Sequence, residues 1–490
     1  MEHFDLQKVL FSIFFVTLLT WCVNYLWWNR RSIICTWRIP GPPTFPIIGN
    51  SYKFFRRDVE LFDILIEYFQ YPGIGKFLFG NKLWCLIFEP RYIQKVLNSS
   101  ITIDKPKDYD RVTELIGEGL LSSSYEISQP IRKAVAPMFS EKALMTYVPI
   151  FNQSSALFAN ILKQLAGQKS IHWETITAKY FVDTSCKTLL GFNVPINLNE
   201  SNKYDLAYCI RRVIDLLTYR YVSIWLNVRF LWNLSKTKKE IDKCLEIFEN
   251  HVQQILKKRI EKNGQDKFEN DLFRYIDTNP GFSKAEVSDI DVIKPLLALS
   301  VEVSSITLCT VLITLALYPD IQQQVHQEVV DVVGQQQIKI SDLPRLELTD
   351  RVIKETMRLF PPFTIYARET TAELHLDQYI IPADSTMVIF PELVHRNPKY
   401  WKDPLQFDPN RFLPEAVAQR NPYAYIPFSH GARNCLGWEH SLVNLKIVTA
   451  TVIRDLKVFT DYKSIEEIKR NFKLILKLPE GCKLWFEIRK

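Results

Sequence analysis

The chain has 490 residues, of which 47% are hydrophobic, so it can bury a large core and is not a disordered chain. Its 61 Lys and Arg residues exceed its 54 Asp and Glu residues, giving a net charge of +7 that is spread along the chain. This distribution argues against a nucleic-acid-binding block and favours an anionic membrane surface or an acidic protein partner. Nine cysteines at wide, irregular spacings form neither a CxxC pair nor a disulfide framework, which favours a reducing compartment.

An uncharged run over residues 9–28 is long enough, as a helix, to cross the hydrocarbon core of a membrane. It ends at Trp27 and Trp28, which suit the membrane interface, and it lacks the small-residue cleavage site of a signal peptide. Arg30 and Arg31 follow it, whereas acidic residues outweigh the basic ones before it. The positive-inside rule therefore predicts a single-pass anchor with the rest of the chain facing the cytosol.

Four glycosylation sequons offer a test of this orientation. They would be modified if the chain faced a lumen, and they lie at Asn98, Asn152, Asn199 and Asn233. The cytosolic orientation predicts that all four are bare.

The chain beyond the anchor is predicted to be one large body. Pro40-Gly41-Pro42-Pro43 forms a stiff, turn-rich stretch that can hold a globular body at a set angle. We therefore divide the chain into an anchor at 1–30, a basic and proline-rich hinge at 31–49 and a catalytic domain at 50–490.

Helical patterns dominate most of the catalytic domain. From about residue 50 to 275 the apolar positions mostly recur at helical spacing. A long helix that is apolar all round is predicted from the break at 279–281 to Tyr318, with Pro295 as a kink near its start. Shorter helices are predicted at about 320–333 and 348–360.

Strand patterns appear towards the C-terminus. One set occupies 374–391, and a hairpin is predicted over 472–488 around Pro479-Glu480-Gly481. The fold class is therefore mainly α with small β sheets, preceded by an N-terminal transmembrane helix.

A glycine-punctuated segment before a helical stretch carries the chemistry. It reads Phe428-Ser-His-Gly431-Ala-Arg433-Asn-Cys435-Leu-Gly437. Glycines let the backbone pass close to a flat cofactor, Arg433 can pair with an acidic group on it, and the helix N-terminus favours thiolate over thiol. A thiolate is a strong electron donor to haem iron, and this donation favours cleavage of an O–O bond. The other eight cysteines are interpreted as small core residues.

The same segment matches without exception the haem-binding signature of the cytochrome P-450 superfamily, Phe-x-x-Gly-x-Arg-x-Cys-x-Gly, and the chain resembles that family from about residue 40 to its end. Within the family it is similar to the microsomal branch that includes fatty-acid hydroxylases and many insect members. The resemblance implies the cytochrome P-450 fold and location in the endoplasmic reticulum membrane. It also implies haem b (iron protoporphyrin IX) with Cys435 as the metal ligand, bound by Phe428, Gly431, Arg433 and Gly437.

Two upstream elements agree with the family in order and spacing. Glu355-Thr-Met-Arg358 resembles its Glu-x-x-Arg helix, in which three-residue spacing puts both side chains on one face. The segment 407–412 is similar to its Pro-x-Arg-Phe element. The resemblance implies that Arg411 joins Glu355 and Arg358 in a buried charged network that braces the cysteine loop.

Two further arginines are implied to bind the cofactor. Arg368 is expected to contact a haem propionate together with Arg433. Arg132 aligns with the arginine of the family's Trp-x-x-x-Arg helix, although Ser128 replaces the tryptophan.

The long helix departs from the family in its oxygen-activation region. Counting back from the end of the helix aligns Leu299–Ser304 with the family's Gly-x-Asp-Thr-Thr. Ser300 then sits at the glycine, Glu302 at the acid, and Val303 at the threonine whose hydroxyl helps deliver protons. Ser304 cannot simply substitute, because one residue along a helix turns the side chain about 100° away. Glu302 and Ser304 are the candidate catalytic residues.

Three functions remain open on this sequence. Glu302 acting through an ordered water, or a hydroxyl of the substrate, would preserve monooxygenation of a lipophilic substrate. A reductase-independent isomerase or dehydratase would act on a peroxide-like substrate. A haem-binding protein with little turnover would sense or carry a ligand.

Electrons for monooxygenation must come from a partner, because no Gly-rich dinucleotide fingerprint or P-loop follows a predicted strand. The resemblance implies an NADPH-dependent cytochrome reductase, assisted by cytochrome b5, and the acidic surface of the reductase would suit the basic chain.

Leu299 occupies the place of the glutamate that bonds to haem in the fatty-acid hydroxylase branch, so haem without an ester link is expected. Tyr221–Leu234 is either a membrane-dipping collector of lipophilic substrate or an ordinary amphipathic helix. The pocket is predicted to be largely apolar, with Val303 and 363–365 among its lining.

Overall fold

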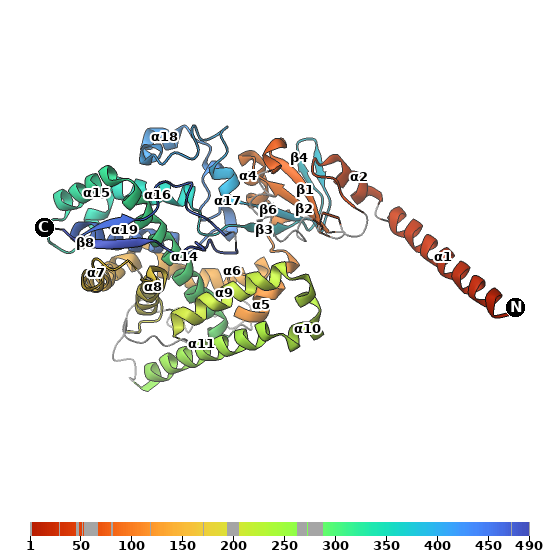
Figure 1. Cartoon of the computed structure of the whole chain (residues 1–490), viewed down its shortest axis with the longest axis horizontal. Helices are drawn as coiled ribbons and strands as arrows, with labels where there is room; N and C mark the ends of the chain where they lie inside the picture. Colours follow the sequence, from red (N-terminus) through yellow and green to blue (C-terminus); the bar gives the residue numbers. More distant parts are fainter. Residues whose placement is uncertain are drawn as a thin grey trace.

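The computed structural model of the chain is mainly helical, with three small sheets in the part that it describes (Figure 1). That part comprises residues 2–28, 30–45, 49–50, 52, 67–79, 82–117, 119–169, 171–193, 205–261, 272, 288–471 and 473–489. The break predicted at 279–281 and the sequon at Asn199 lie outside these residues. The predicted fold class, mainly α with small sheets, is confirmed.

The helices are α1 (Glu2–Trp28), α2 (Arg30–Arg38), α4 (Pro90–Asn98), α5 (Asp110–Ile116), α6 (Tyr125–Val135), α7 (Glu141–Gln164), α8 (Trp173–Leu189), α9 (Leu206–Val222), α10 (Arg229–Leu234), α11 (Lys236–Glu261), α14 (Asp289–Leu317), α15 (Pro319–Val332), α16 (Glu347–Leu359), α17 (Pro391–His395), α18 (Pro414–Ala418) and α19 (Trp438–Asp455). The strands are β1 (Ile74–Phe79), β2 (Lys82–Ile87), β3 (Tyr366–Glu369), β4 (Leu374–Leu376), β5 (Tyr379–Ile381), β6 (Thr386–Ile389), β7 (Leu456–Thr460) and β8 (Leu484–Ile488).

Helix α1 projects away from the body of the protein (Figure 1). Its window Lys8–Tyr25 has a mean hydropathy of 1.5, and none of it is buried against the rest of the chain. A long apolar helix that does not pack against the rest of the protein is suited to span the hydrocarbon core of a membrane. The still more apolar Ile290–Leu317 of α14 is instead mostly buried inside the body, as predicted.

Helix α2 occupies the start of the segment predicted to be a hinge. It lies against β5, and Arg31 forms an ion pair of 2.8 Å with Glu373 at the surface. The first part of the predicted hinge is therefore a helix that contacts the body, and the proline-rich part follows it.

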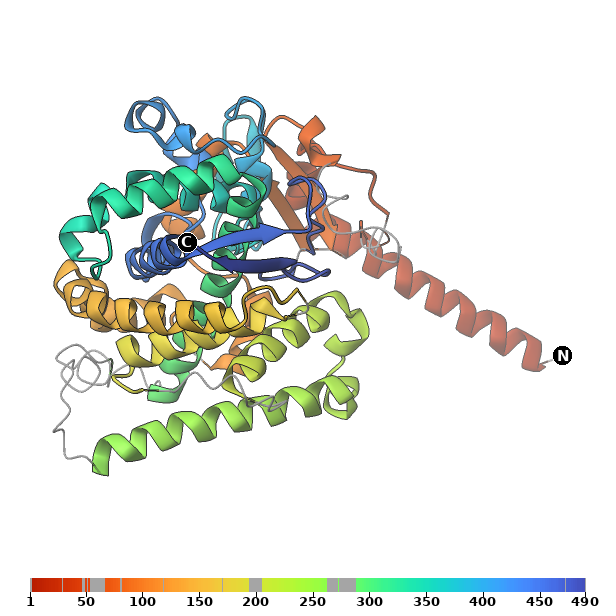
Figure 2. The same cartoon turned by 60° about the vertical axis from the view of Figure 1, so that its left-hand side comes forward.

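Helix α14 lies at the centre of the main core. It packs against α8, α9, α16, α19 and β7. Ser288 caps its start by accepting a hydrogen bond of 3.2 Å from the backbone of Asp291, and Pro295 lies within its first turns, as predicted. On one side of the core α8 and α9 both contact α14, and α11 packs on α9 as the outermost helix (Figure 2).

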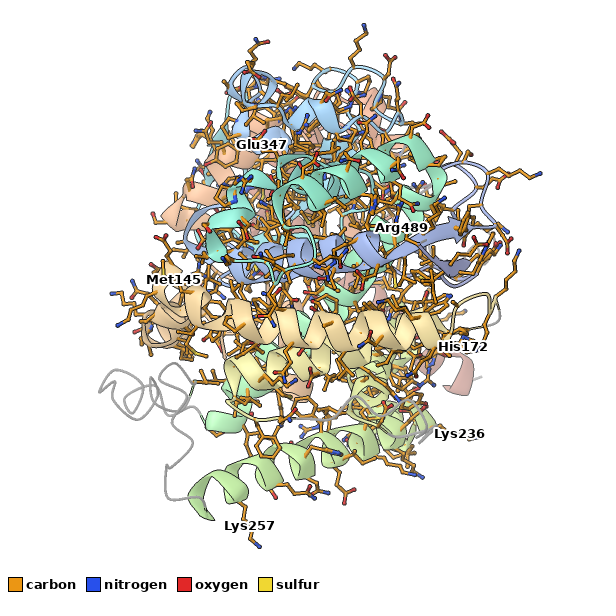
Figure 3. The ribbon with its side chains drawn as sticks, turned by 90° about the vertical axis from the view of Figure 1, so that its left-hand side faces the viewer. Met145, His172, Lys236, Lys257, Glu347 and Arg489 are labelled. Carbon is orange, nitrogen blue, oxygen red and sulfur yellow. The ribbon has the colours of Figure 1, made fainter. Side chains whose placement is uncertain are left out.

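Helix α7 covers another side of this core. Figure 3 shows it crossing the middle of the view between Met145 and His172, with α11 between Lys236 and Lys257 below it. Asn152 in α7 is buried: its amide nitrogen donates to the carbonyl groups of Val148 at 2.9 Å and Ile338 at 2.8 Å, and its oxygen accepts from the backbone of Ile338 at 3.0 Å. The sequons at Asn98 and Asn233 lie at the surface.

Two strands lie in the region whose pattern was interpreted as mainly helical. β1 pairs antiparallel with β2, and β2 pairs parallel with β6, giving a sheet in the order β1-β2-β6-β3. The predicted strands at 374–391 appear as β4, β5 and β6. The predicted hairpin over 472–488 is wrong in its pairing, because β8 pairs with β7 directly after α19 and not with the segment before the turn.

The two shorter helices form where they were predicted. α15 starts with Pro319 and ends before Gly334, which has φ of +60°, a backbone conformation that glycine adopts without strain. α16 ends at Leu359, directly before the Phe360-Pro361-Pro362 stretch.

Candidate active site

The cysteine motif forms a tight loop between the 3₁₀ helix η10 (Gly431–Arg433) and α19. The backbone N–H of Cys435 donates to the carbonyl of Phe428 at 2.9 Å, which closes the loop. Gly431 has φ of +76°, and a Cβ there would lie 2.1 Å from the carbonyl oxygen of Leu97 in α4. Only glycine fits this approach, so α4 fixes the position of the loop.

The sulfur of Cys435 faces a cavity inside the protein, and its side chain is exposed there. Burial raises the pKa of the Cys435 thiol, while the Gly437 N–H and the positive charge of Arg132 act in the opposite direction. The N–H contribution from the start of α19 is the one expected from the motif, but alone it does not overcome burial. A metal ion at the sulfur is the charge that deprotonates a coordinating thiol outright.

The cavity brings together most of the residues predicted from the sequence. The predicted cofactor and catalytic residues that line it are Arg132, Arg368, Phe428, Arg433, Cys435, Gly437 and Ser304. Helix α14 contributes a further, mainly apolar part of the lining. Gly431 supports the loop from outside, against α4.

Three cations crowd one part of this cavity: Lys105, Arg368 and Arg433. Burial, followed by repulsion from the two arginines, holds the pKa of Lys105 well below its usual range. Burial and the neighbouring Arg368 lower the pKa of Arg433 to about 10. Arg368 thus helps to lower the pKa of both Lys105 and Arg433, and the three cations together form a site for an anion, which would neutralise them.

The hydrogen bonding of Arg433 points the same way. Its Nη2 donates to the carbonyl of Ser123 at 2.8 Å, whereas its buried Nη1 has no hydrogen-bond partner among the described residues. A buried unpaired guanidinium nitrogen is costly, so it marks a place where an acceptor belongs. A porphyrin with two carboxylates beside these cations, and with its metal at Cys435, fits the residues that are present.

Arg132 contacts the cysteine loop directly. In α6, its Nη1 donates to the backbone carbonyl of Asn434 at 2.8 Å, and its Nη2 donates to the side chain of Asn434. Ser128, one turn earlier where the family has tryptophan, also lines the cavity. Arg132 therefore holds the residue that precedes Cys435 as well as facing the cavity.

The two candidate catalytic residues on α14 are not brought together. Glu302 is 3% exposed, and it is absent from the cavity lining: it pairs with Lys477 and lies 3.5 Å from Arg211. Ser304 does line the cavity, but its hydroxyl lies 3.3 Å from that of Ser441 in α19. The structure therefore places the carboxylate of Glu302 in an ion-pair cluster away from the cavity.

Glu355, Arg358 and Arg411 meet in one buried network. The guanidinium of Arg358 makes a two-pronged contact with Glu355, at 2.7 and 2.8 Å, and both side chains are 0% exposed. Arg411 approaches the same carboxylate at 3.4 Å. Arg358 also donates to the carbonyl of His395 at 2.9 Å. The ring of His395 accepts from the backbone of Ile426 at 2.8 Å, so the network reaches the segment that leads into the cysteine loop.

Sequence reasoning missed Lys105 and Asn434 as parts of the site. Neither belongs to a recognisable spacing, since Lys105 comes from the loop before α5, far along the chain from Arg368 and Arg433. The position of Asn434 within the cysteine motif was the one available signal.

The comparisons with known proteins agree with this geometry. The family model Cytochrome P450 matches residues 39–486, so the chain belongs to the cytochrome P450 family, whose members are haem-thiolate oxidoreductases that act generally as monooxygenases. Cytochrome P450 4c21 of Blattella germanica is 28% identical over 92% of this chain and 93% of its own length. Cytochrome P450 4V2 of Mus musculus is 27% identical, over 95% and 91%, and cytochrome P450 4d2 of Drosophila melanogaster is 28% identical, over 98% and 99%.

Proposed function

We propose that this enzyme inserts one oxygen atom of O2 into a lipophilic substrate, with haem b bound through Cys435. The observation that carries the proposal is the cavity in which Cys435, a cluster of three cations and the apolar face of α14 meet. When bound through a thiolate, haem supplies the electron donation that favours O–O cleavage.

The residues of the chain divide the work of holding the cofactor. Cys435 is the metal ligand, Arg368 and Arg433 bind the propionates, and Phe428 and Gly437 line the cavity beside the cofactor. Arg132 orients the cysteine loop through Asn434. With Leu299 where a covalent bond would need a carboxylate, haem is held without an ester link, and acid-acetone extraction should remove it.

The substrate should be apolar, because leucine and valine dominate the part of α14 that faces the cavity. An exposed apolar patch over η6 (Ile224–Asn227) and α10 supports delivery from a membrane: Trp225 is 57%, Phe230 69% and Leu234 63% exposed. In an ordinary amphipathic helix the apolar side chains pack against the protein, whereas no residue of the described part of the chain covers these three.

Electrons are proposed to come from an NADPH-dependent cytochrome reductase in the same membrane, with cytochrome b5 as a second donor. The exposed α1 supports membrane anchoring, and we place the protein as a single-pass protein of the endoplasmic reticulum with its body in the cytosol. The net charge of +7 suits an acidic partner surface.

The test is the absorption spectrum of the reduced, carbon-monoxide-bound protein in membranes, for the wild type and Cys435→Ala. A strongly red-shifted Soret band that disappears in the variant is expected. Cys309→Ala is the matched control, because Cys309 is buried in α14 and does not line the cavity. A band that survives removal of the Cys435 sulfur would end the proposal.

Two assays separate this function from the alternatives. Product formation that follows NADPH and oxygen, in the presence of reductase, supports monooxygenation. Consumption of a lipid hydroperoxide without reductase would support an isomerase or dehydratase instead. Haem binding with silence in both assays would indicate a ligand-binding protein.

A further inference from the structure

Four of the residues that α14 contributes to the cavity lining are partly exposed. They are Leu296, Leu299, Ser300 and Val303, within a helix that is otherwise buried around them. Their spacing of three, one and three residues defines one face of an α-helix. Ser300 is the polar side chain among these four. Ser304, one turn further along, also lines the cavity but is only 5% exposed.

Ser300 and Val303 lie one turn apart on that face, because residues three apart are neighbours on a helix surface. Val303 has the shape of threonine but cannot donate or accept a hydrogen bond. The hydroxyl that is missing at Val303 is therefore available one turn earlier, with the same orientation towards the cavity.

Ser300 is also oriented by a partner. Its hydroxyl lies 2.9 Å from that of Ser185 in α8 and 3.1 Å from the carbonyl of Leu297. Ser185 lines the cavity too. Ser300 is the donor in both contacts. Because a hydroxyl can rotate, Ser300 can instead donate into the cavity once an acceptor is bound there.

The other polar groups of this stretch of α14 have partners of their own, although Ser304 and its partner Ser441 also line the cavity. Glu302 lies in the ion-pair cluster with Lys477 and Arg211, and Ser304 faces Ser441 in α19. Ser305 contacts Thr177 at 2.8 Å, away from the cavity.

We propose that Ser300, oriented by Ser185, replaces the hydroxyl that Val303 lacks and donates a hydrogen bond to the oxygen that is reduced during turnover. This inference rests on the proposed monooxygenase function. The overall reaction consumes the substrate, one O2, two electrons from the reductase and two protons from water, and yields the hydroxylated product and one water. Each proton that Ser300 gives up is replaced from cavity water, directly or by way of Ser185, so both serines end neutral.

The test is the C–O stretching frequency of the ferrous carbon-monoxide complex of the full-length protein, which needs neither turnover nor a known substrate. A hydrogen bond to the ligand oxygen lowers this frequency, so Ser300→Ala should shift it upward. The matched control is Ser305→Ala, which removes a buried hydroxyl from the same helix without touching the cavity. This control should leave the frequency unchanged.

A double variant makes the assignment specific. Val303→Thr added to Ser300→Ala should return the frequency towards the wild-type value, because it restores a hydroxyl one turn further along the same face. With reductase and NADPH, Ser300→Ala should release more hydrogen peroxide per NADPH than the wild type, and the double variant less than Ser300→Ala.

The outcomes separate failure of the role assigned to Ser300 from failure of the haem-thiolate function. If Ser300→Ala and wild type have the same frequency and the same peroxide yield, Ser300 does not face the ligand and the inference is wrong. If the wild type forms no red-shifted carbon-monoxide complex at all, the haem-thiolate function itself fails.

Discussion

His440, five residues after Cys435, is a histidine in an aromatic environment. Its ring makes edge contacts with Phe139, Tyr147 and Phe151, and it shares a hydrogen bond of 2.9 Å with Thr188. Burial lowers the pKa of His440 from its ordinary value of 6.5 to about 4. The imidazole is therefore neutral in the folded protein at neutral pH.

This pKa shift predicts an acid-dependent loss of stability. Below pH 6.5 the unfolded chain binds a proton at His440 that the folded protein refuses until pH falls to about 4, so stability decreases across that window. The slope from one proton is at most about 1.4 kcal/mol per pH unit. His440→Phe should make the free energy of unfolding less pH-dependent there. Thr188 keeps a hydrogen bond to Thr184 in the variant, so its hydroxyl is not left unpaired. An unchanged pH dependence of the free energy of unfolding would contradict the assigned shift.

At the scale of elements, the cysteine loop depends on how closely it approaches α4. Gly431→Ala should place a methyl group against the carbonyl of Leu97, so the loop must move and haem retention should fall. Gly481 has a similar φ of +74° but open space around it, so Gly481→Ala should cost only the backbone strain of about 1–2 kcal/mol. The haem-to-protein ratio after purification measures both. Equal losses would show that the approach to α4 is unimportant.

Elements defined by local signals were predictable from the sequence, and those that depend on distant partners were not. The ends of α15 and α16 follow from Gly334 and Pro361, which act locally. β1 and β2 were missed although Gly80-Asn81 between two apolar runs is a hairpin signal that helical spacing obscured. β8 has a strand composition, but its pairing with β7 depends on where α19 delivers the chain.

The candidate site shows the same division. The cysteine motif identifies Cys435 and its neighbours because the loop is local. The alignment of α14 located Val303 and Glu302 by position along the helix, but it gave no information about what faces them. The ion pair of Glu302 with Lys477 joins residues far apart in the chain, so only the folded structure could remove its carboxylate from the cavity.

At the scale of the whole molecule, α10 lies on the side of the body from which α1 projects (Figure 1). This arrangement predicts that the body keeps a second membrane contact after residues 1–28 are deleted. Phe230→Ser with Leu234→Ser should weaken vesicle binding of the shortened protein roughly a hundredfold or more, since burying each such side chain is worth about 1.5–3 kcal/mol. Leu157→Ser, at an exposed position of α7, should have no effect. Binding that ignores the double substitution would show that the patch stays in water.

The amide of Asn152 joins α7 to Ile338, beyond α15, through two hydrogen bonds, and makes a third within α7 to Val148. An oligosaccharide attached there during translocation would leave no room for those bonds, and α7 could not settle on its neighbours. A lumenal orientation with glycosylation at Asn152 would therefore be incompatible with this packing of α7. The cytosolic orientation proposed above leaves Asn152 unmodified and able to make these hydrogen bonds.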